Sequence, residues 1–310
     1  MPAGRLDPLE VRRILRAEGL RANHARSQNF LADPEVLQAI LDLAEVGAGD
    51  RVLEIGPGLG ILTGGLLEAG ASVVAIELDA GLATFLAKAQ ASSIEAGRLR
   101  LIEGDALDQD LLDLCEPPFR VVANLPYHIT SPVLHRLLGG TPRPERLVLM
   151  VQLEVAERIA AAPGRMSYLS AFVQYHAEVE VARRVAASAF EPAPKVDSAV
   201  IVLRPRDGVP LGRPGGEAED ALWRLVQAGF RERRKMIRNV LARQLPIDQA
   251  TVDRGLAAVG IAGDRRPQTL SVEEWLGLLE ALPALGRDRR GRAHQPVSQG
   301  PEASPREAAE

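Results

Sequence analysis

Residues 51–66 read RVLEIGPGLGILTGGL, a short β-branched run that enters a glycine-rich turn and then an apolar helical pattern. A second β-branched run, SVVAIE at 72–77, follows after one helix length. A strand, a tight turn, a helix and a further strand form the unit from which parallel sheets are built. This stretch therefore predicts an α/β fold with a ligand site at the carboxyl end of its first strand.

The same alternation extends along the chain, with further strand-like runs at 100–104, 120–124 and 147–152. The runs AEVEVARRV (177–185) and SAVIVLRP (198–205) are joined by the proline-rich FEPAPKV (190–196), and they indicate an antiparallel hairpin at one sheet edge. The predicted fold class is α/β, a Rossmann-like sheet that is parallel except for this edge hairpin. A small all-α domain is expected at its C-terminal side.

Composition predicts the domain boundaries. The first 26 residues hold six arginines against three acidic residues and should form a basic helix or arm, with its helix at about 8–18. Residues 27–206 form the predicted α/β domain, the glycine- and proline-rich stretch 207–216 a linker, and residues 217–285 a helical domain. Residues 286–310, which lack large apolar groups, predict a disordered tail.

Charge and composition exclude several functional classes. A net charge of −4 over 310 residues argues against nonspecific coating of nucleic acid, which depends on neutralising many phosphates. The single cysteine, Cys115, cannot form an internal disulfide, and five scattered histidines form no ligand motif, so we expect no metal. Without a long apolar run we expect no membrane span and a cytoplasmic location, with a monomer as the simplest assembly.

The glycine-rich turn predicts a ligand that lies against bare backbone, since Gly56 and Gly58 carry no Cβ to block it. The turn departs from the GxGxxG dinucleotide motif because Ile61 stands at the third glycine position. A tight strand-to-helix turn that binds no ligand remains an alternative.

Acidic residues follow the next two strands. Glu77 ends the second strand, 21 residues after Gly56, where a carboxylate can accept hydrogen bonds from both hydroxyls of a ribose. Asp105 follows the third strand and could accept from the amino group of an adenine. Each acid alone would also suit a helix cap or a solvated turn. Three successive strand ends with such residues favour a nucleoside cofactor.

The fourth strand ends in Asn124, Leu125, Pro126 and Tyr127. The amino nitrogen of adenine is a poor nucleophile because its lone pair is delocalised into the ring. Two acceptors, the Asn124 side-chain oxygen and the Leu125 carbonyl, could favour a pyramidal nitrogen, with Pro126 fixing the backbone. Tyr127 offers a flat face on which a base can stack. A structural turn with a core tyrosine remains the alternative.

The motifs SQNFL (27–31), EIGPGLG (54–60), ELD (77–79), GDA (104–106), NLPYHITSP (124–132) and FEPAPKVDSAV (190–200) together resemble the ribosomal RNA adenine dimethyltransferases. Within this family the chain is similar to the KsgA/RsmA branch, which acts on the small ribosomal subunit. The likeness covers residues 24–282 with the motifs in the family's order.

This resemblance implies an S-adenosylmethionine-dependent enzyme that methylates two adjacent adenines twice at N6, in a hairpin loop near the 3′ end of 16S rRNA. We would expect an in-line displacement in which catalysis is mainly positioning and desolvation. The resemblance further implies that S-adenosylmethionine is contacted by Asn29, Leu31, Gly56, Gly58, Glu77, Asp105 and Asn124. Phe190 would sandwich the adenine opposite Tyr127.

A basic segment at 230–243 carries six Lys or Arg against one Glu. Apolar residues at helical spacing leave Arg231, Arg234, Lys235 and Arg238 on another face, and the resemblance implies that this face grips rRNA backbone. A merely solvated helix face is the alternative.

Three other functions remain open. Ser27 stands where the family usually has glycine and is typical of the Erm methyltransferases of large-subunit rRNA, whereas Leu125 and the KVDSAV run oppose that interpretation. A non-catalytic assembly or transcription factor on the same fold is a second alternative, and a nicotinamide dehydrogenase, opposed by Ile61, is a third. His128 replaces a common asparagine, and we interpret it as a loop residue rather than a base.

Overall fold

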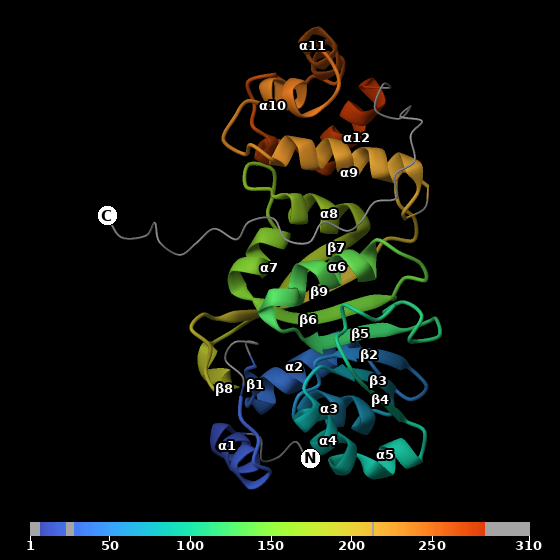
Figure 1. The fold of residues 1–310 in the computed structure, drawn as a ribbon, viewed down its shortest axis with the longest axis vertical. Helices are drawn as coiled ribbons and strands as arrows, with labels where there is room; N and C mark the ends of the chain where they lie inside the picture. The colour runs from blue at the N-terminus through green and yellow to red at the C-terminus, as the bar shows by residue number, and fades with distance from the viewer. Residues whose placement is uncertain (1–6, 23–27, 213, 283–310) are drawn as a thin grey trace, which may run out of the picture.

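The computed structural model describes residues 7–22, 28–212 and 214–282, and Figure 1 shows a sheet with helices on both faces and further helices stacked beyond α8. The strands of the main sheet are β2 (Arg51–Ile55), β3 (Ser72–Glu77), β4 (Leu99–Glu103), β5 (Arg120–Asn124), β6 (Arg146–Gln152), β7 (Ala177–Val185) and β9 (Ser198–Pro205). Their order is β4-β3-β2-β5-β6-β9-β7, with parallel pairing from β4 to β6. The predicted Rossmann-like fold class is confirmed.

Both faces of this sheet are covered because its central strands are apolar on both sides. Val52 packs into the core beside α1 (Pro8–Ala17), α2 (Pro34–Ala44), α3 (Ile61–Glu68), α4 (Ala80–Ala89) and α5 (Ala91–Glu95). Its neighbour Leu53 packs into the core beside α6 (Thr130–Leu138), α7 (Leu153–Ile159) and α8 (Tyr168–His176). Successive residues of one strand therefore serve opposite cores, as strand geometry requires.

The antiparallel hairpin is present, but its strands are not simply added at the edge in chain order. β9 pairs with both β6 and β7 and so lies between them, and β7 is the edge strand. The register shifts between Val181 and Arg183, where β7 carries a bulge. The connection between the two strands contains β8 (Phe190–Glu191), which the sequence did not predict.

β8 pairs outside the main sheet. It forms a two-stranded antiparallel sheet with β1 (Phe30–Leu31), in which Phe30 is opposite Glu191 and Leu31 is opposite Phe190. Two segments 160 residues apart in the chain are thus joined next to the carboxyl ends of β2 and β3 (Figure 1).

The C-terminal helices are α9 (Glu217–Phe230), α10 (Ile237–Gln244), α11 (Gln249–Ala258) and α12 (Val272–Ala281). Their core also takes in Met166, Ala171 and Tyr175 from in and around α8. Val209, within the predicted linker, is buried in the same core. The linker predicted from composition therefore lies where the core continues from α8 into the C-terminal helices. The domain limits stay a prediction.

A polar cluster joins α8 to α9. We call Arg143, His176, Glu219 and Trp223 the junction cluster. His176 is 0% exposed and Glu219 is 2% exposed. The Arg143 guanidinium lies 3.0 Å from His176 Nδ1, and His176 Nε2 lies 3.0 Å from Glu219 Oε1. Since a guanidinium can only donate, Nδ1 must accept and the imidazole proton is on Nε2, which lies near the carboxylate but makes no hydrogen bond of good geometry.

Three predicted features fall outside the described residues. These are Ser27, the tail at 286–310, and parts of the N-terminal arm. Within the described part of that arm, α1 begins at Pro8, as expected, with Asp7 accepting from the Glu10 amide as its N-cap.

Candidate functional site

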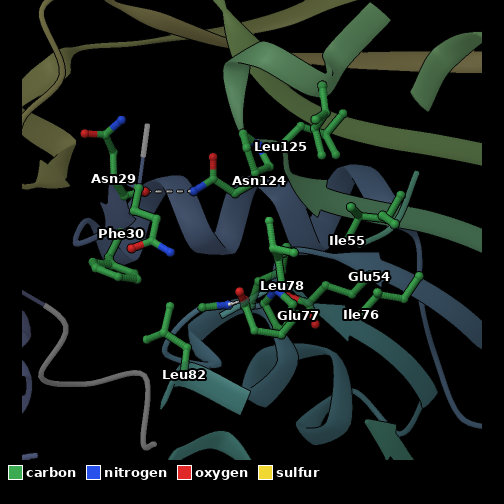
Figure 2. A pocket seen from close by; sticks show the side chains of 18 of the residues that line it. Asn29, Phe30, Glu54, Ile55, Ile76, Glu77, Leu78, Leu82, Asn124 and Leu125 are labelled. Atoms are coloured by element: carbon green, nitrogen blue, oxygen red, sulfur yellow. Dashed lines mark hydrogen bonds between the residues drawn. The ribbon is translucent and has the colours of Figure 1, made fainter. Parts of the chain in front are cut away.

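A cavity of about 1110 Å³, counted out to its open mouth, lies at the carboxyl ends of β2, β3, β4 and β5. All seven residues predicted to contact a cofactor line it: Asn29, Leu31, Gly56, Gly58, Glu77, Asp105 and Asn124. Leu125, Pro126 and Tyr127 also line it. Figure 2 shows that its wall is assembled from segments distant in sequence, with Asn29 and Phe30 approaching Asn124.

The glycine-rich turn packs closely against its neighbours. Gly56 and Gly58 have φ angles of 70° and 57°, in the left-handed region that favours glycine. A Cβ built on Gly58 would lie 3.1 Å from the Phe30 ring, and one on Gly56 would lie 3.4 Å from Pro126 Cδ. These positions thus need glycine for the fold itself, and they leave main chain exposed to the cavity.

The Glu77 carboxylate links the two turns that frame the cavity. Its Oε2 accepts from the Gly58 amide and its Oε1 from the Asp79 amide, both at 2.9 Å. The side chain is 4% exposed, and burial raises its pKa although the backbone donors oppose the rise. Each carboxylate oxygen has a further lone pair, so the group can still accept from a hydroxyl of a bound ribose.

Glu54 is a second buried acid in the cavity wall, and it was not among the residues predicted from the sequence. It is 1% exposed, and its Oε2 accepts from Thr63 Oγ1 at 2.7 Å. Burial raises its pKa to about 8, and the nearby Glu77 charge adds to the rise. The signal was available, because strand alternation turns residue 54 to the same face as buried Val52.

Asp105 takes its place through a local turn. The half-buried side chain accepts from the Leu107 amide at 2.8 Å, so one oxygen is engaged in an Asx-type turn. The other oxygen can face the cavity that this residue lines.

Asn124 is oriented by a residue from a distant segment. Its Nδ2 donates to the Asn29 carbonyl at 3.2 Å, drawn as the dashed line in Figure 2. Because that partner accepts, the amide nitrogen must point toward it and Oδ1 points away. Leu125 is 1% exposed and its amide donates to Met150 O, which fixes the backbone between Asn124 and Pro126.

Tyr127 lines the cavity and begins a single 3-10 turn (Tyr127–Ile129). Its hydroxyl lies 2.9 Å from Ser198 Oγ, and burial raises the pKa of the half-buried phenol. Ser198 is the first residue of β9, so the hairpin helps to hold the ring. His128 is exposed in the same turn, as expected of a loop residue.

Phe190 is not among the residues that line the cavity. It is 2% exposed and packs in the core that also contains Leu31, its partner in the β1–β8 pairing. Phe30, which was not singled out, lines the cavity instead. The structure therefore does not bring Phe190 and Tyr127 to face each other across it.

The four predicted RNA-contacting residues are all exposed and lie away from the cavity. Arg231, Arg234 and Lys235 do not share a helix face, because α9 ends at Phe230 and α10 begins only at Ile237. Arg238 alone is on a helix. Arg231 donates to Gln244 Oε1 at 3.0 Å. The basic group is a loop between two helices, with Met236 exposed at its end.

Among residues 7–22, 28–212 and 214–282, no group of three or more His, Cys, Asp or Glu side chains is arranged to hold a metal ion. Across the same ranges, no helix has both the length and the apolar character needed to cross a bilayer.

Comparison with known proteins identifies one family. The family described as ribosomal RNA adenine dimethylase matches residues 19–282. The protein named Ribosomal RNA small subunit methyltransferase A from Geobacter sulfurreducens is 42% identical over 283 residues, which cover 88% of this chain and 99% of the relative. The protein of the same name from Cutibacterium acnes is 40% identical, with 91% and 96% covered.

Two solved structures are similar over most of the chain. A dimethyladenosine transferase from Plasmodium falciparum aligns with a TM-score of 0.69 and 27% identity, covering 83% of this chain and 98% of the other. The 23S rRNA methyltransferase ErmE aligns with a TM-score of 0.64 and 30% identity, covering 82% and 100%.

Proposed function

The chain belongs to the ribosomal RNA adenine dimethylase family, and on this premise we propose that it dimethylates adenine N6 in the 16S RNA of the small ribosomal subunit. Relatives named for the small ribosomal subunit, 40 to 42% identical over nearly their whole length, support this choice. The orientation of the Asn124 side chain supports this chemistry. Its Nδ2 donates to the Asn29 carbonyl, which leaves Oδ1 available to accept a hydrogen bond from a bound amine.

We propose S-adenosylmethionine as the methyl donor, held by the cavity at the ends of β2 to β5. When bound, this cofactor supplies a methyl group already activated by a positively charged sulfur. Gly56 and Gly58 offer bare main chain, Glu77 acceptors for ribose hydroxyls, and Asp105 an acceptor for an amino group. A ligand that carries positive charge would favour the ionised forms of Glu54 and Glu77 and so oppose the rise in their pKa values.

The residues of the NLPY turn would then activate the adenine. Asn124 Oδ1 and the Leu125 carbonyl accept from the two N–H bonds of the amino group. These hydrogen bonds draw the nitrogen lone pair out of the ring and direct it toward the methyl donor. As the bond from nitrogen to the methyl carbon forms, the bond from that carbon to sulfur would break and S-adenosylhomocysteine would leave. The methylated amine would then lose one proton to solvent, so no strong base is required. Rate enhancement comes from positioning and from preorganised acceptors.

Tyr127 is the proposed stacking face for the base, since it lines the cavity mouth with its hydroxyl held by Ser198. A matching role for Phe190 requires β8 to shift, because its ring is 2% exposed. Substitution of Phe190 by Ala would also open a core cavity, at about 3–5 kcal/mol, and so would not isolate stacking.

The exposed cations of the loop between α9 and α10 are the proposed contact to rRNA phosphates. The finer substrate, two adjacent adenines in a hairpin loop near the 3′ end of 16S rRNA, is part of the same proposal.

The test is transfer of labelled methyl groups to isolated unmethylated small subunits and, separately, to large subunits, with the modified bases mapped. We expect label at N6 of two adjacent small-subunit adenines. The likeness to ErmE makes large-subunit rRNA the second candidate, and label confined to that subunit would overturn the proposal. Absence of transfer to either subunit would favour a non-catalytic assembly factor.

A further inference from the structure

The helix α1 packs against segments that form part of the cavity wall. Val11 and Leu15 are 0% and 9% exposed and pack into the core that contains Phe30 and Leu31. Figure 1 shows α1 next to the β1–β8 sheet, and the two elements α1 and β8 are in contact. Beyond the C-terminal end of α1, Leu20 lies close to the start of α4, since a Cβ built on Gly81 would be 3.2 Å from Leu20 Cδ2. α1 contacts β8, and the segment that follows α1 contacts the start of α4.

One side chain of α1 makes a two-point ion pair with β8. Arg12 Nε lies 2.6 Å from Glu191 Oε1, and Arg12 Nη2 donates to Glu191 Oε2 at 2.8 Å. The Glu191 side chain is only 13% exposed. A bidentate pair of this kind fixes direction as well as distance. Arg13, the next residue, pairs instead with Glu10 of its own helix.

The pairing of β8 transmits this constraint to the cavity wall. Glu191 is opposite Phe30, whose ring lies so close to Gly58 that a Cβ there would be 3.1 Å away. Gly58 in turn donates its amide to Glu77. A shift of β8 would therefore displace Phe30 from its contact with the glycine-rich turn and change the space beside Glu77.

We propose that Arg12 is a positioning residue for cofactor binding, acting through Glu191 and the β1–β8 pairing to hold Phe30 against the glycine-rich turn. The inference rests on the proposed function only in taking this cavity as the S-adenosylmethionine site. Arg12 itself is not among the residues that line the cavity.

Binding of S-adenosylhomocysteine to the purified full chain, measured by calorimetry, tests the proposal without turnover. Arg12→Gln should weaken binding roughly fivefold, the size expected for a half-exposed bidentate pair. Arg13→Gln is the matched control and should leave affinity unchanged. In methyl-transfer assays, Arg12→Gln should raise KM for S-adenosylmethionine and leave KM for the ribosomal subunit unaltered, which a simple loss of folded protein would not do.

A reversed pair separates positioning from general destabilisation. Arg12→Glu with Glu191→Arg should recover most of the lost affinity, while each single change weakens it. If Arg12→Gln and Arg13→Gln bind equally well, or if the reversed pair binds no better than the single variants, the proposal is wrong. If the unaltered chain binds no S-adenosylhomocysteine, the proposed function fails instead.

Discussion

The cavity and the junction cluster both contain buried carboxylates, but the hydrogen-bond donors around these carboxylates differ. In the cavity, Glu54 and Glu77 have raised pKa values because burial outweighs the few hydrogen bonds they accept. In the junction cluster, burial also raises the pKa of Glu219, but His176, Trp223 and the Gly215 amide more than offset it and the pKa falls. Burial alone therefore does not fix the direction of a carboxylate's pKa shift, which also depends on the donors around the group.

The largest expected effect separates the two regions by function. Asn124→Ala removes the oriented acceptor and should lower the single-turnover rate of methyl transfer by about 10³-fold or more, while subunit binding is retained. Quench-flow measurement with saturating donor would detect it. Wild-type turnover by this variant would remove Asn124 from the mechanism.

In the junction cluster, a substitution should lower stability and leave turnover nearly unchanged. Glu219→Gln places an amide donor among existing donors and should cost about 3 kcal/mol of unfolding free energy, measured by urea denaturation. Turnover per folded molecule should change less than twofold. The control is Glu180→Gln, since Glu180 pairs with Arg204 at the surface and its loss should cost under about 0.5 kcal/mol. Equal losses in the two variants would mean that the buried Glu219 carboxylate stabilises the fold no more than a surface carboxylate.

Glu54 predicts a loss of stability as pH rises. Its folded pKa, about 8, lies above the unfolded value, so the folded chain holds a proton that the unfolded chain has released. Unfolding free energy should drop by about 2 kcal/mol between about pH 6 and pH 7.5 relative to Glu54→Gln. Denaturation of both proteins across this range is the measurement, and parallel curves would contradict it.

For His176 we expect the opposite pH dependence, a loss of stability as the pH falls. Burial and the Arg143 charge lower its pKa, despite the opposing Glu219 contact, so the unfolded chain takes up a proton first as pH falls below about 6.5. Stability should fall as the pH is lowered toward 5.5, relative to His176→Gln. A slope that persists in the variant would assign the acid sensitivity elsewhere.

The smallest expected effect concerns the exposed basic loop between α9 and α10. Replacing Arg234 and Lys235 together by Gln should weaken subunit binding about fivefold and flatten its dependence on log salt by about one to two charges. Arg204→Gln, an exposed cation already paired on the sheet, is the control and should leave the slope unchanged. Equal slopes in all three proteins would leave the loop a solvated surface.

Much of the fold was predictable because the strands of the main sheet can be recognised in the sequence from their apolar and β-branched residues. All seven lie within one residue of the predicted runs. The residues at strand ends followed, since parallel strands bring their carboxyl ends to one edge. The cavity residues Gly56, Glu77, Asp105 and Asn124 converge for this reason.

The remaining features depend on contacts that leave no local pattern. β1 and β8 are two residues each, too short to show alternation, and their pairing buries Phe190 and exposes Phe30 to the cavity instead. Residues 231–236 carry good helix formers, yet α9 ends at Phe230, so the basic residues form a loop. Strand alternation could have placed Glu54 on a buried face, but not its hydrogen bond with Thr63, which comes from α3.

The place of β9 has a consequence during synthesis. β7 precedes β9 in the chain but pairs with β9 alone, and β9 also covers β6. While the ribosome has released only residues up to about 190, β9 is absent, and the edges of β6 and β7 that pair with β9 have no partner strand. We expect nascent chains halted there to be protease-sensitive and prone to associate, and chains halted well beyond residue 205 to be protected.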